Sequence, residues 1–279
     1  MTLAARRRMA LWLAATAAAA WARAAPPEGP HGLLLQGAEA EAFLSTAKVV
    51  SMKAIPVGIA RPQQVTLSLG DRTLRAVWKT IDEQKTGVTN FDGGGFEVDF
   101  RDSYKLGIAT YELDKLIGLE LVPPTIEREI DGKTGSLQLW VEGCITEWDR
   151  KQKNLKAPDL EQWNRQMYKV RLLHNLTYDT DAANIRNVIV DTTDFRVFAI
   201  DNSRTFRRYD KLMAPKDLTR FSRTVVEHLK TLDAGVVHEK LGRWLGRYEI
   251  EGLMKRRDLI VALAAQLVAE RGEDAVLYP

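Results

Sequence analysis

The chain has 279 residues, 45% of them hydrophobic and 28% charged, which suits one large globular domain or two smaller lobes. Its formal net charge is +3, but the first 24 residues hold four arginines and no acidic residue. Without them, 36 basic side chains face 37 acidic ones, a net charge of −1, and no basic stripe with interleaved aromatic residues is present. The sequence therefore argues against a nucleic-acid partner.

Residues 1–24 have the pattern of a signal peptide. Three arginines precede an apolar run from Met9 to Trp21, and the segment ends in the small-x-small triplet Ala22-Arg23-Ala24. The apolar run is too short to cross about 30 Å of hydrocarbon as a helix. We therefore expect an exported protein, periplasmic or secreted, with no permanent membrane anchor. A transit peptide or a disordered tail is the alternative, and a misread leader would leave the protein in the cytoplasm.

The first half of the remaining chain is predicted to be rich in β-strands. A linker over residues 25–36 leads to a short helix over 37–47, and alternating polar and apolar side chains predict the strands that follow. A loop over 82–95 and a helix over 104–117, which stops at Gly118, separate these from a second strand pair. The predicted strands are 49–52, 65–69 and 73–79 around a turn at Gly70-Asp71, and 121–127 and 136–141 around a turn at Asp131-Gly132.

The second half changes to helices, with one hairpin between them. A long amphipathic helix is predicted over residues 160–176, and others near 219–231 and 250–270. Strands followed by helices indicate an α+β fold. The basic run Lys255-Arg256-Arg257 is interpreted as a solvated helix face. The single cysteine, Cys144, cannot form an internal disulfide and is interpreted as apolar filler.

The hairpin carries the polar residues that suggest chemistry. With residues 191–194 as its loop, Val190 faces Phe195. The same register puts Asn184 opposite Asp201, and such partners lie about 5 Å apart. A carboxylate and an amide oxygen at that separation suit a hard divalent cation. We therefore predict Asn184 and Asp201 as metal ligands.

Three other residues complete the candidate site. Asp179 precedes Asn184 by the spacing that separates a kinase catalytic Asp from its metal-binding Asn, although Asp and Asn also favour turns and caps. Lys79 ends a predicted strand in an A-x-K pattern typical of a phosphate-binding lysine, and an exposed strand lysine would look the same. Gly58 lies between two predicted strands, where a phosphate-covering turn would lie, but no G-x-G-x-x-G surrounds it.

The order of these pieces resembles a known family, the secretory-pathway casein kinases and their bacterial relatives. The segment from Tyr111 to Pro124 resembles their helix and following strand. Asp179 to Ile185 resembles a D-R-H-x-x-N-I catalytic loop, also found in HipA-like and phosphatidylinositol-kinase-like enzymes, and Ile200 to Phe206 is similar to their I-D-x-S/G-R-x-F metal motif. The resemblance extends from about Phe43 to Phe206.

The resemblance implies a bilobal protein-kinase-like fold with a β-rich N-lobe over residues 37–142 and an α-helical C-lobe over 143–279. It also implies ATP as cofactor, with Mg²⁺ or Mn²⁺, and a strand from Gln138 to Trp140 that leads to the inter-lobe hinge. The implied roles are catalysis for Asp179, metal binding for Asn184 and Asp201, and nucleotide binding for Lys79, Gly58 and Gln138.

The sequence departs from the family in two places. The loop reads Asp179-Thr180-Asp181 where relatives have Asp-Arg-His. The helix glutamate that should pair with the strand lysine is replaced by Gly107, and Glu97 or Asp99 in the preceding loop are the candidates that could reach Lys79 instead.

Four interpretations follow. The first is a kinase that transfers the γ-phosphoryl group of ATP to a hydroxyl of a protein or small-molecule acceptor. The second is a pseudokinase, a nucleotide- or partner-binding module in which turnover is lost because of Gly107. The third takes Asp179-Thr180-Asp181 as the D-x-D motif of a metal-dependent glycosyltransferase. The fourth is a structural protein in which these residues only cap helices and form turns.

Overall fold

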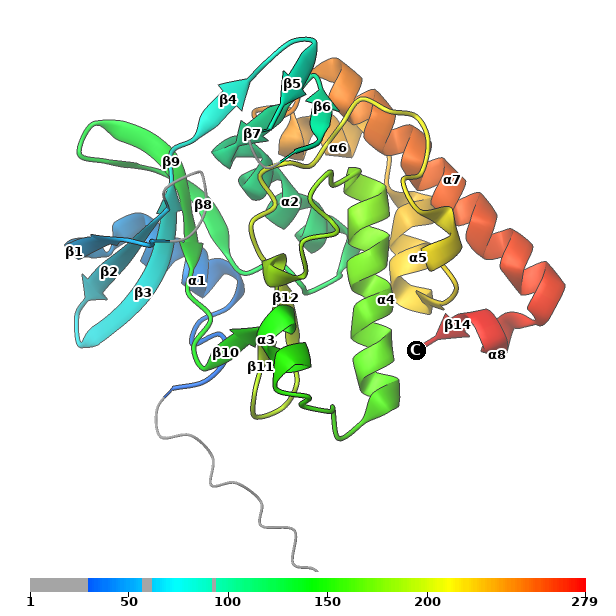
Figure 1. Cartoon of the computed structure of the whole chain (residues 1–279), viewed down its shortest axis with the longest axis horizontal. Helices are drawn as coiled ribbons and strands as arrows, with labels where there is room; N and C mark the ends of the chain where they lie inside the picture. The colour runs from blue at the N-terminus through cyan, green and yellow to red at the C-terminus, as the bar shows by residue number, and fades with distance from the viewer. Residues whose placement is uncertain (1–29, 57–61, 92–93) are drawn as a thin grey trace, which may run out of the picture.

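A computed structural model describes residues 30–56, 62–91 and 94–279 of the chain. Strands dominate the part before residue 143 and helices the part after it, with a small sheet near the junction (Figure 1). The predicted α+β fold class is confirmed. The predicted signal peptide, part of the predicted linker and Gly58 lie outside the described residues.

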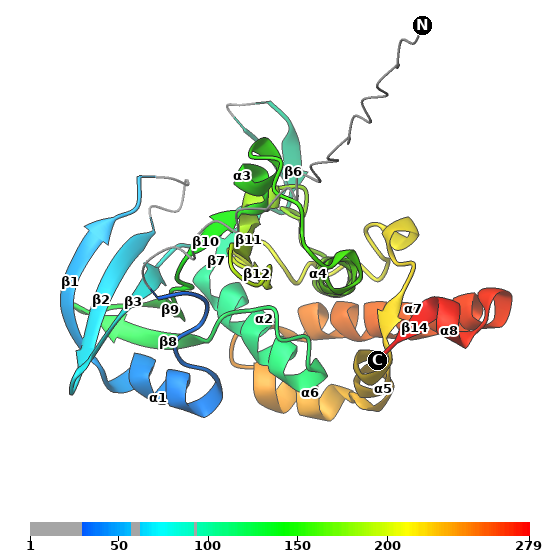
Figure 2. The same ribbon diagram turned by 90° about the horizontal axis from the view of Figure 1, so that it is seen from below.

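The largest sheet has five antiparallel strands in the order β1-β2-β3-β9-β8. Gly70 and Gly132, in the two predicted turns, have φ of 62° and 74°, a left-handed conformation that glycine adopts without strain. Helix α1 (Gly37–Thr46) covers one face of the sheet (Figure 2) and buries Phe43 and Leu44. The strands are β1 Lys48–Ala54, β2 Gln63–Leu69, β3 Arg72–Lys79, β8 Thr125–Ile130 and β9 Lys133–Leu139.

The segment predicted as a loop over residues 82–95 instead contains strands. β4 (Asp82–Gln84) pairs with β7 (Arg101–Ser103), and β5 (Val88–Asn90) pairs with β6 (Phe96–Val98). Each strand has only three residues. A strand this short carries too little polar-apolar alternation to be recognised in the sequence, so the loop prediction was wrong here.

Helix α2 (Tyr104–Ile117) has the predicted bounds because its ends carry strong local signals. The Ser103 side chain accepts a hydrogen bond from Lys105 N at 3.3 Å, and Gly118 ends the helix with φ of 68°. Its buried side chains, which include Leu106, Leu113 and Ile117, join the hydrophobic core formed with the later helices. The lobe boundary predicted after residue 142 stays a prediction.

A three-stranded sheet follows, in the order β10-β11-β12. Its strands are β10 Cys144–Thr146, β11 Val188–Asp191 and β12 Val197–Ala199. β11 and β12 form the predicted hairpin, but Val190 faces Val197 rather than Phe195. The Asp191 carboxylate accepts a hydrogen bond from Thr193 N at 2.7 Å, and Asp191 N donates to Arg196 O at 2.9 Å. This side-chain turn keeps Asp191 in the ladder and shifts the register.

The helical part packs around α4 (Leu160–Thr177), with the long α7 (Arg247–Arg271) crossing behind it (Figure 1). These two helices lie close to their predicted positions, and the helix predicted near 219–231 begins later, after a two-residue strand. No helix in the described part of the chain is long and apolar enough to cross a membrane. The remaining elements are α3 Glu147–Gln152, the 3₁₀ helices η1 Ile185–Asn187 and η2 Pro215–Asp217, β13 Phe221–Ser222, α5 Arg223–Thr231, α6 Ala234–Leu241, α8 Glu273–Val276 and β14 Leu277–Tyr278.

Candidate active site

Lys79 and Asp201 meet where the large sheet approaches the small one. Lys79 is the last residue of β3, and Asp201 lies two residues beyond β12. Lys79 Nζ forms an ion pair with Asp201 Oδ1, and their side chains are 15% and 41% exposed. Lys79 was predicted to bind phosphate and Asp201 to bind metal, and the fold brings the two side chains together.

The backbone at Asp201 is in an unusual conformation. Its φ is 57°, in the left-handed region that non-glycine residues rarely adopt. Ser203 Oγ donates to Asp201 Oδ1 at 3.2 Å, and Asn202 Nδ2 donates to Ala199 O at 3.3 Å. These contacts hold the carboxylate in place, and strain of this kind persists only where the surroundings enforce it.

Two cavities lie where the sheets meet, and Lys79 and Asp201 line the smaller one. A small cavity of about 20 Å³ is lined by Lys79, Asp201, Gly107 and Gln138, among others. A larger one of about 390 Å³ lies between the two sheets, and Gln138 lines both. Gln138 Nε2 donates to Thr125 Oγ1 at 2.9 Å. The side chains around the larger cavity are mostly apolar, as in sites that hold a flat organic group. They include Val77, Trp140, Cys144, Ile189 and Ile200.

Asp179 begins the polar loop, residues 179–184, directly after Tyr178, which caps the end of α4 in a left-handed conformation with φ of 51°. Asp179 is 3% exposed, and its Oδ1 accepts a hydrogen bond from Asp181 N at 2.9 Å. Burial, together with the charges of Asp181 and Asp201, raises the pKa of Asp179 to about 7. A carboxyl group with this pKa can exchange a proton near neutral pH.

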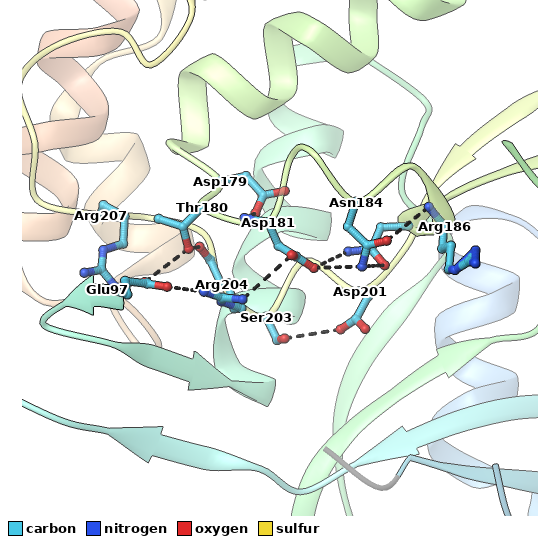
Figure 3. A network of polar contacts seen from close by, with 11 residues as sticks. Glu97, Asp179, Thr180, Asp181, Asn184, Arg186, Asp201, Ser203, Arg204 and Arg207 are labelled. Atoms are coloured by element: carbon cyan, nitrogen blue, oxygen red, sulfur yellow. Dashed lines mark hydrogen bonds and ion pairs between the residues drawn. The ribbon is translucent and has the colours of Figure 1, made fainter. Parts of the chain in front are cut away.

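Asn184 does not face Asp201 across a strand ladder, and the predicted pairing is wrong. The ladder ends at Val188 opposite Ala199, four residues short of Asn184, which instead caps η1 through a 3.3 Å hydrogen bond from Arg186 N. Asn187 O accepts a hydrogen bond from Ile200 N at 2.8 Å, which keeps this turn beside the Asp201 segment. Figure 3 shows Asn184 and Asp201 in neighbouring positions.

Asp181 organises the polar loop, a role that sequence reasoning did not assign to it. Its Oδ2 accepts hydrogen bonds from Asn184 Nδ2 at 3.1 Å and from Asn187 Nδ2 at 2.8 Å, and its Oδ1 lies 3.7 Å from Arg204 Nη1 (Figure 3). The Asn184 amide is thereby oriented with both its nitrogen and its oxygen engaged. The spacing of polar residues in the loop was the only available signal.

Glu97, on β6, joins the β5–β6 hairpin to the polar loop (Figure 3). It forms ion pairs with Arg204 and with Arg207, the latter at 3.0 Å, and Thr180 Oγ1 donates to it at 3.2 Å. Glu97 is therefore engaged away from Lys79. Asp99 accepts a hydrogen bond from Gly87 N at 2.9 Å. Neither residue takes the place of the missing helix glutamate.

Gly107 lies on α2 and lines the small cavity beside Lys79 and Asp201. A Cβ added to Gly107 would meet no described atom within 4 Å. The position predicted to correspond to the lysine-pairing glutamate therefore lines the cavity and has room for a side chain.

The interpretation of the basic run Lys255-Arg256-Arg257 as a solvated helix face is wrong for Arg256. Its side chain is fully buried, and burial lowers its pKa to about 10. Nε donates to Leu176 O at 2.7 Å, and Nη1 donates to Arg207 O at 2.8 Å and to Tyr209 O. Arg256 thus ties α7 to the end of α4, just before the polar loop, and to the segment after Asp201. A basic run on a helix does not reveal which of its members points inward.

Comparison with solved structures identifies the fold. Fam20 of Hydra, determined with a sugar, matches with a TM-score of 0.62 and 14% identity over 85% of this chain and 90% of that one. The Golgi casein kinase matches with a TM-score of 0.57 and 13% identity over 86% and 78%. The proinflammatory kinase CtkA of Helicobacter pylori has a TM-score of 0.49 and 8% identity over 83% and 98%.

In the sequence comparisons, no protein-family model and no curated protein matches the chain. At 14% and 13% sequence identity, the structural similarity shows the fold alone. On that ground the predicted resemblance is confirmed, and the chain has the atypical kinase-like fold of Fam20 and the Golgi casein kinase.

Proposed function

We propose that this chain is an atypical kinase that binds ATP with Mg²⁺ or Mn²⁺ and transfers the γ-phosphoryl group to a hydroxyl of a protein or small-molecule acceptor. The observation that carries the proposal is the ion pair between Lys79 and Asp201 beside a cavity of about 390 Å³. A phosphate-binding lysine, a metal-binding carboxylate and an apolar recess for the base are the parts that this reaction needs.

The ligand atoms that two of the predicted residues offer are of the kind that a divalent cation prefers. Hard cations prefer oxygen ligands, and Asp201, with 41% of its side chain exposed, offers a carboxylate while Asn184 offers an amide oxygen. Bound metal would neutralise charge on the phosphate oxygens. In this proposal Lys79 holds the phosphates, with Gln138 beside the base. Gly58, predicted to bind the nucleotide, lies outside the described residues. Asp179 orients the acceptor hydroxyl and accepts its proton, a role that its buried carboxyl group suits.

The pseudokinase interpretation is the second candidate, and Gly107 favours it. Kinases depend on the pair between the strand lysine and the helix glutamate, and here that helix position carries no side chain. A nucleotide-binding module without turnover would retain Lys79 and Asp201. The glycosyltransferase interpretation does not agree with the kinase-like fold.

The test combines binding and turnover on the chain without residues 1–24. Binding of ATP is measured by calorimetry with Mg²⁺, with Mn²⁺ and with EDTA, and phosphoryl transfer is followed with radiolabelled ATP and mixed protein and polyol acceptors. We expect metal-dependent binding that Asp201→Ala abolishes, and transfer that Asp179→Ala abolishes while binding persists. Binding without transfer by the wild type, with transfer restored by Gly107→Glu, would favour the pseudokinase. No metal-dependent binding would contradict both candidates.

We also propose that the protein is exported after cleavage at the small-x-small triplet Ala22-Arg23-Ala24, as the basic and apolar pattern of the leader suggests. Amino-terminal sequencing of the protein recovered from expressing cells tests this proposal. A mature chain that begins near Ala25 is the expected result, and an intact leader on protein recovered from the cytoplasm would contradict it.

A further inference from the structure

A buried carboxylate that the sequence analysis did not single out lies next to the point where β7 is tied to the segment after Asp201. Asp102, on β7 and directly before the first turn of α2, is 9% exposed. Its Oδ1 is buried and has no hydrogen-bond partner among the described residues. An unpaired buried carboxylate oxygen is costly in a folded protein, so its retention calls for a reason.

Asp102 is connected to the site through Ser203. The Ser203 hydroxyl donates to Asp201 Oδ1 at 3.2 Å. Because a hydroxyl has one proton, Ser203 cannot donate to a second carboxylate while it holds Asp201. The backbone is tied at the same place, since Ser103 N donates to Ser203 O at 2.9 Å. Burial raises the pKa of Asp102, and the charges of Asp201 and Lys79 are near enough to shift it further, in opposite directions.

Lys79 forms an ion pair with Asp201, and a cation bound to Asp201 would change this arrangement. A cation on Asp201 competes with Lys79 for the same carboxylate, and Lys79 then needs another anionic partner to hold its position on the phosphates. Glu97 and Asp99 are engaged elsewhere, and Gly107 has no side chain. Asp102, by contrast, has a carboxylate oxygen, Oδ1, with no hydrogen-bond partner among the described residues.

We propose that Asp102 is a positioning residue, the counter-ion that holds Lys79 on the nucleotide phosphates in place of the helix glutamate that Gly107 lacks. This inference rests on the proposed function, because it concerns the nucleotide-bound state of the same site. It also explains how a kinase-like site could operate with glycine at that helix position.

The experiment measures ATP affinity by calorimetry in Mg²⁺ and thermal stability without nucleotide, so that binding and folding are separated. Asp102→Asn keeps the shape and removes the charge. We expect ATP to bind about ten-fold or more weakly, the size of one hydrogen bond to a charged group. The unliganded variant should melt at or above the wild-type temperature, because an unpaired buried charge has been removed. Gly107→Glu, added to Asp102→Asn, should restore the affinity.

The control is Glu83→Gln, which removes a carboxylate from the residue paired with Asp102 in the same small sheet and should leave ATP affinity unchanged. If the wild type binds ATP and Asp102→Asn binds it with the same affinity, this inference alone is overturned. It is also overturned if Asp102→Asn binds ATP more weakly and the added Gly107→Glu does not restore the affinity. Absence of ATP binding by the wild type overturns the proposed function and this inference with it.

If Asp102→Asn does not fold, the ATP affinity of Gly107→Glu in the wild-type background tests the inference instead. We then expect an affinity within about three-fold of the wild type, because Asp102 already supplies the counter-ion. A gain in ATP affinity of about ten-fold or more, the size of one hydrogen bond to a charged group, would show that Lys79 has no counter-ion in the wild type. That result would overturn the inference.

Discussion

His174 Nε2 lies 3.8 Å from Asp179 Oδ2 in a buried pair whose two pKa values are displaced in opposite directions. Burial lowers the pKa of His174 from 6.5 to about 4 and raises that of Asp179 from 3.8 to about 7. Near pH 5.5 both groups are therefore neutral in the folded protein, while both are charged in the unfolded chain.

The pair predicts an unusual dependence of stability on pH. Between about pH 4 and 6.5, the unfolded state binds the extra proton of His174, so this group makes stability rise with pH. Over the same range the folded state holds the extra proton of Asp179, which makes stability fall as pH rises. The two slopes, each up to about 1.4 kcal/mol per pH unit, oppose one another.

Asp179→Asn should therefore give a free energy of unfolding that rises with pH over this range relative to wild type, and His174→Gln one that falls. Urea unfolding at several pH values measures these differences, and groups elsewhere contribute equally to all three proteins. Parallel stability curves for the wild type and both variants would contradict the assignment.

The ion pair at the candidate site predicts separate effects on binding and on folding. In Lys79→Met, Asp201 keeps access to water, so the melting temperature should change by no more than about 3 °C. ATP affinity should fall about ten-fold or more because the phosphates lose a charged donor. Calorimetry and thermal melting supply the two measurements. The control is Lys85→Met, which removes an exposed lysine paired with Glu83. Unchanged ATP affinity in Lys79→Met would remove Lys79 from the site.

Glu97 predicts a link between the β5–β6 hairpin and the polar loop. Glu97→Gln removes the carboxylate that pairs with Arg204 and with the buried Arg207. We expect a loss of about 2 kcal/mol in the free energy of unfolding, since an uncompensated charge is left in the interior. Amide exchange should accelerate in residues 88–98 and 179–184 together, with Glu83→Gln as the control. Faster exchange in the hairpin alone would show that Glu97 does not stabilise the polar loop.

Arg256 predicts a large effect from a residue outside the candidate site. Arg256→Met leaves the carbonyl groups of Leu176, Arg207 and Tyr209 without this donor. The free energy of unfolding should drop by about 3 kcal/mol or more. Arg256→Lys should recover only part of it, because an ammonium cannot reproduce the geometry of the guanidinium.

The matched control is Lys255→Met, which changes the exposed neighbour on the same helix and should stay within about 0.5 kcal/mol of the wild type in urea unfolding. An Arg256→Met protein as stable as this control would rule out the buried contacts as a source of stability.

Local signals in the sequence predicted much of the fold. The turns at Gly70 and Gly132 and the end of α2 at Gly118 were recognised because glycine adopts the left-handed conformation without strain. Helix α4 followed from its apolar periodicity. Each of these features depends on residues close together in the chain.

The register of the β11–β12 hairpin was predicted wrongly for a local but subtler reason. The number of loop residues seemed to set the pairing, whereas the Asp191 side chain accepts a hydrogen bond from Thr193 N and lengthens the paired segment. The predicted opposition of Asn184 and Asp201 failed with the register. The turn that contains Asn184 still lies beside the Asp201 segment, because Ile200 N donates to Asn187 O. The metal-binding roles of the two residues stay a prediction.

By itself, then, the sequence determined the strands, turns and helices that local periodicity and glycine control, and it selected Lys79, Asp179 and Asp201 as candidate residues. Only the tertiary structure decided which charged groups meet. Lys79 and Asp201 are 122 residues apart, and Glu97 and Arg204 are 107 apart. No local pattern records such pairs, because packing of the two sheets against the helices brings them together. The same packing buries Arg256 and leaves a buried oxygen of Asp102 without a hydrogen-bond partner among the described residues.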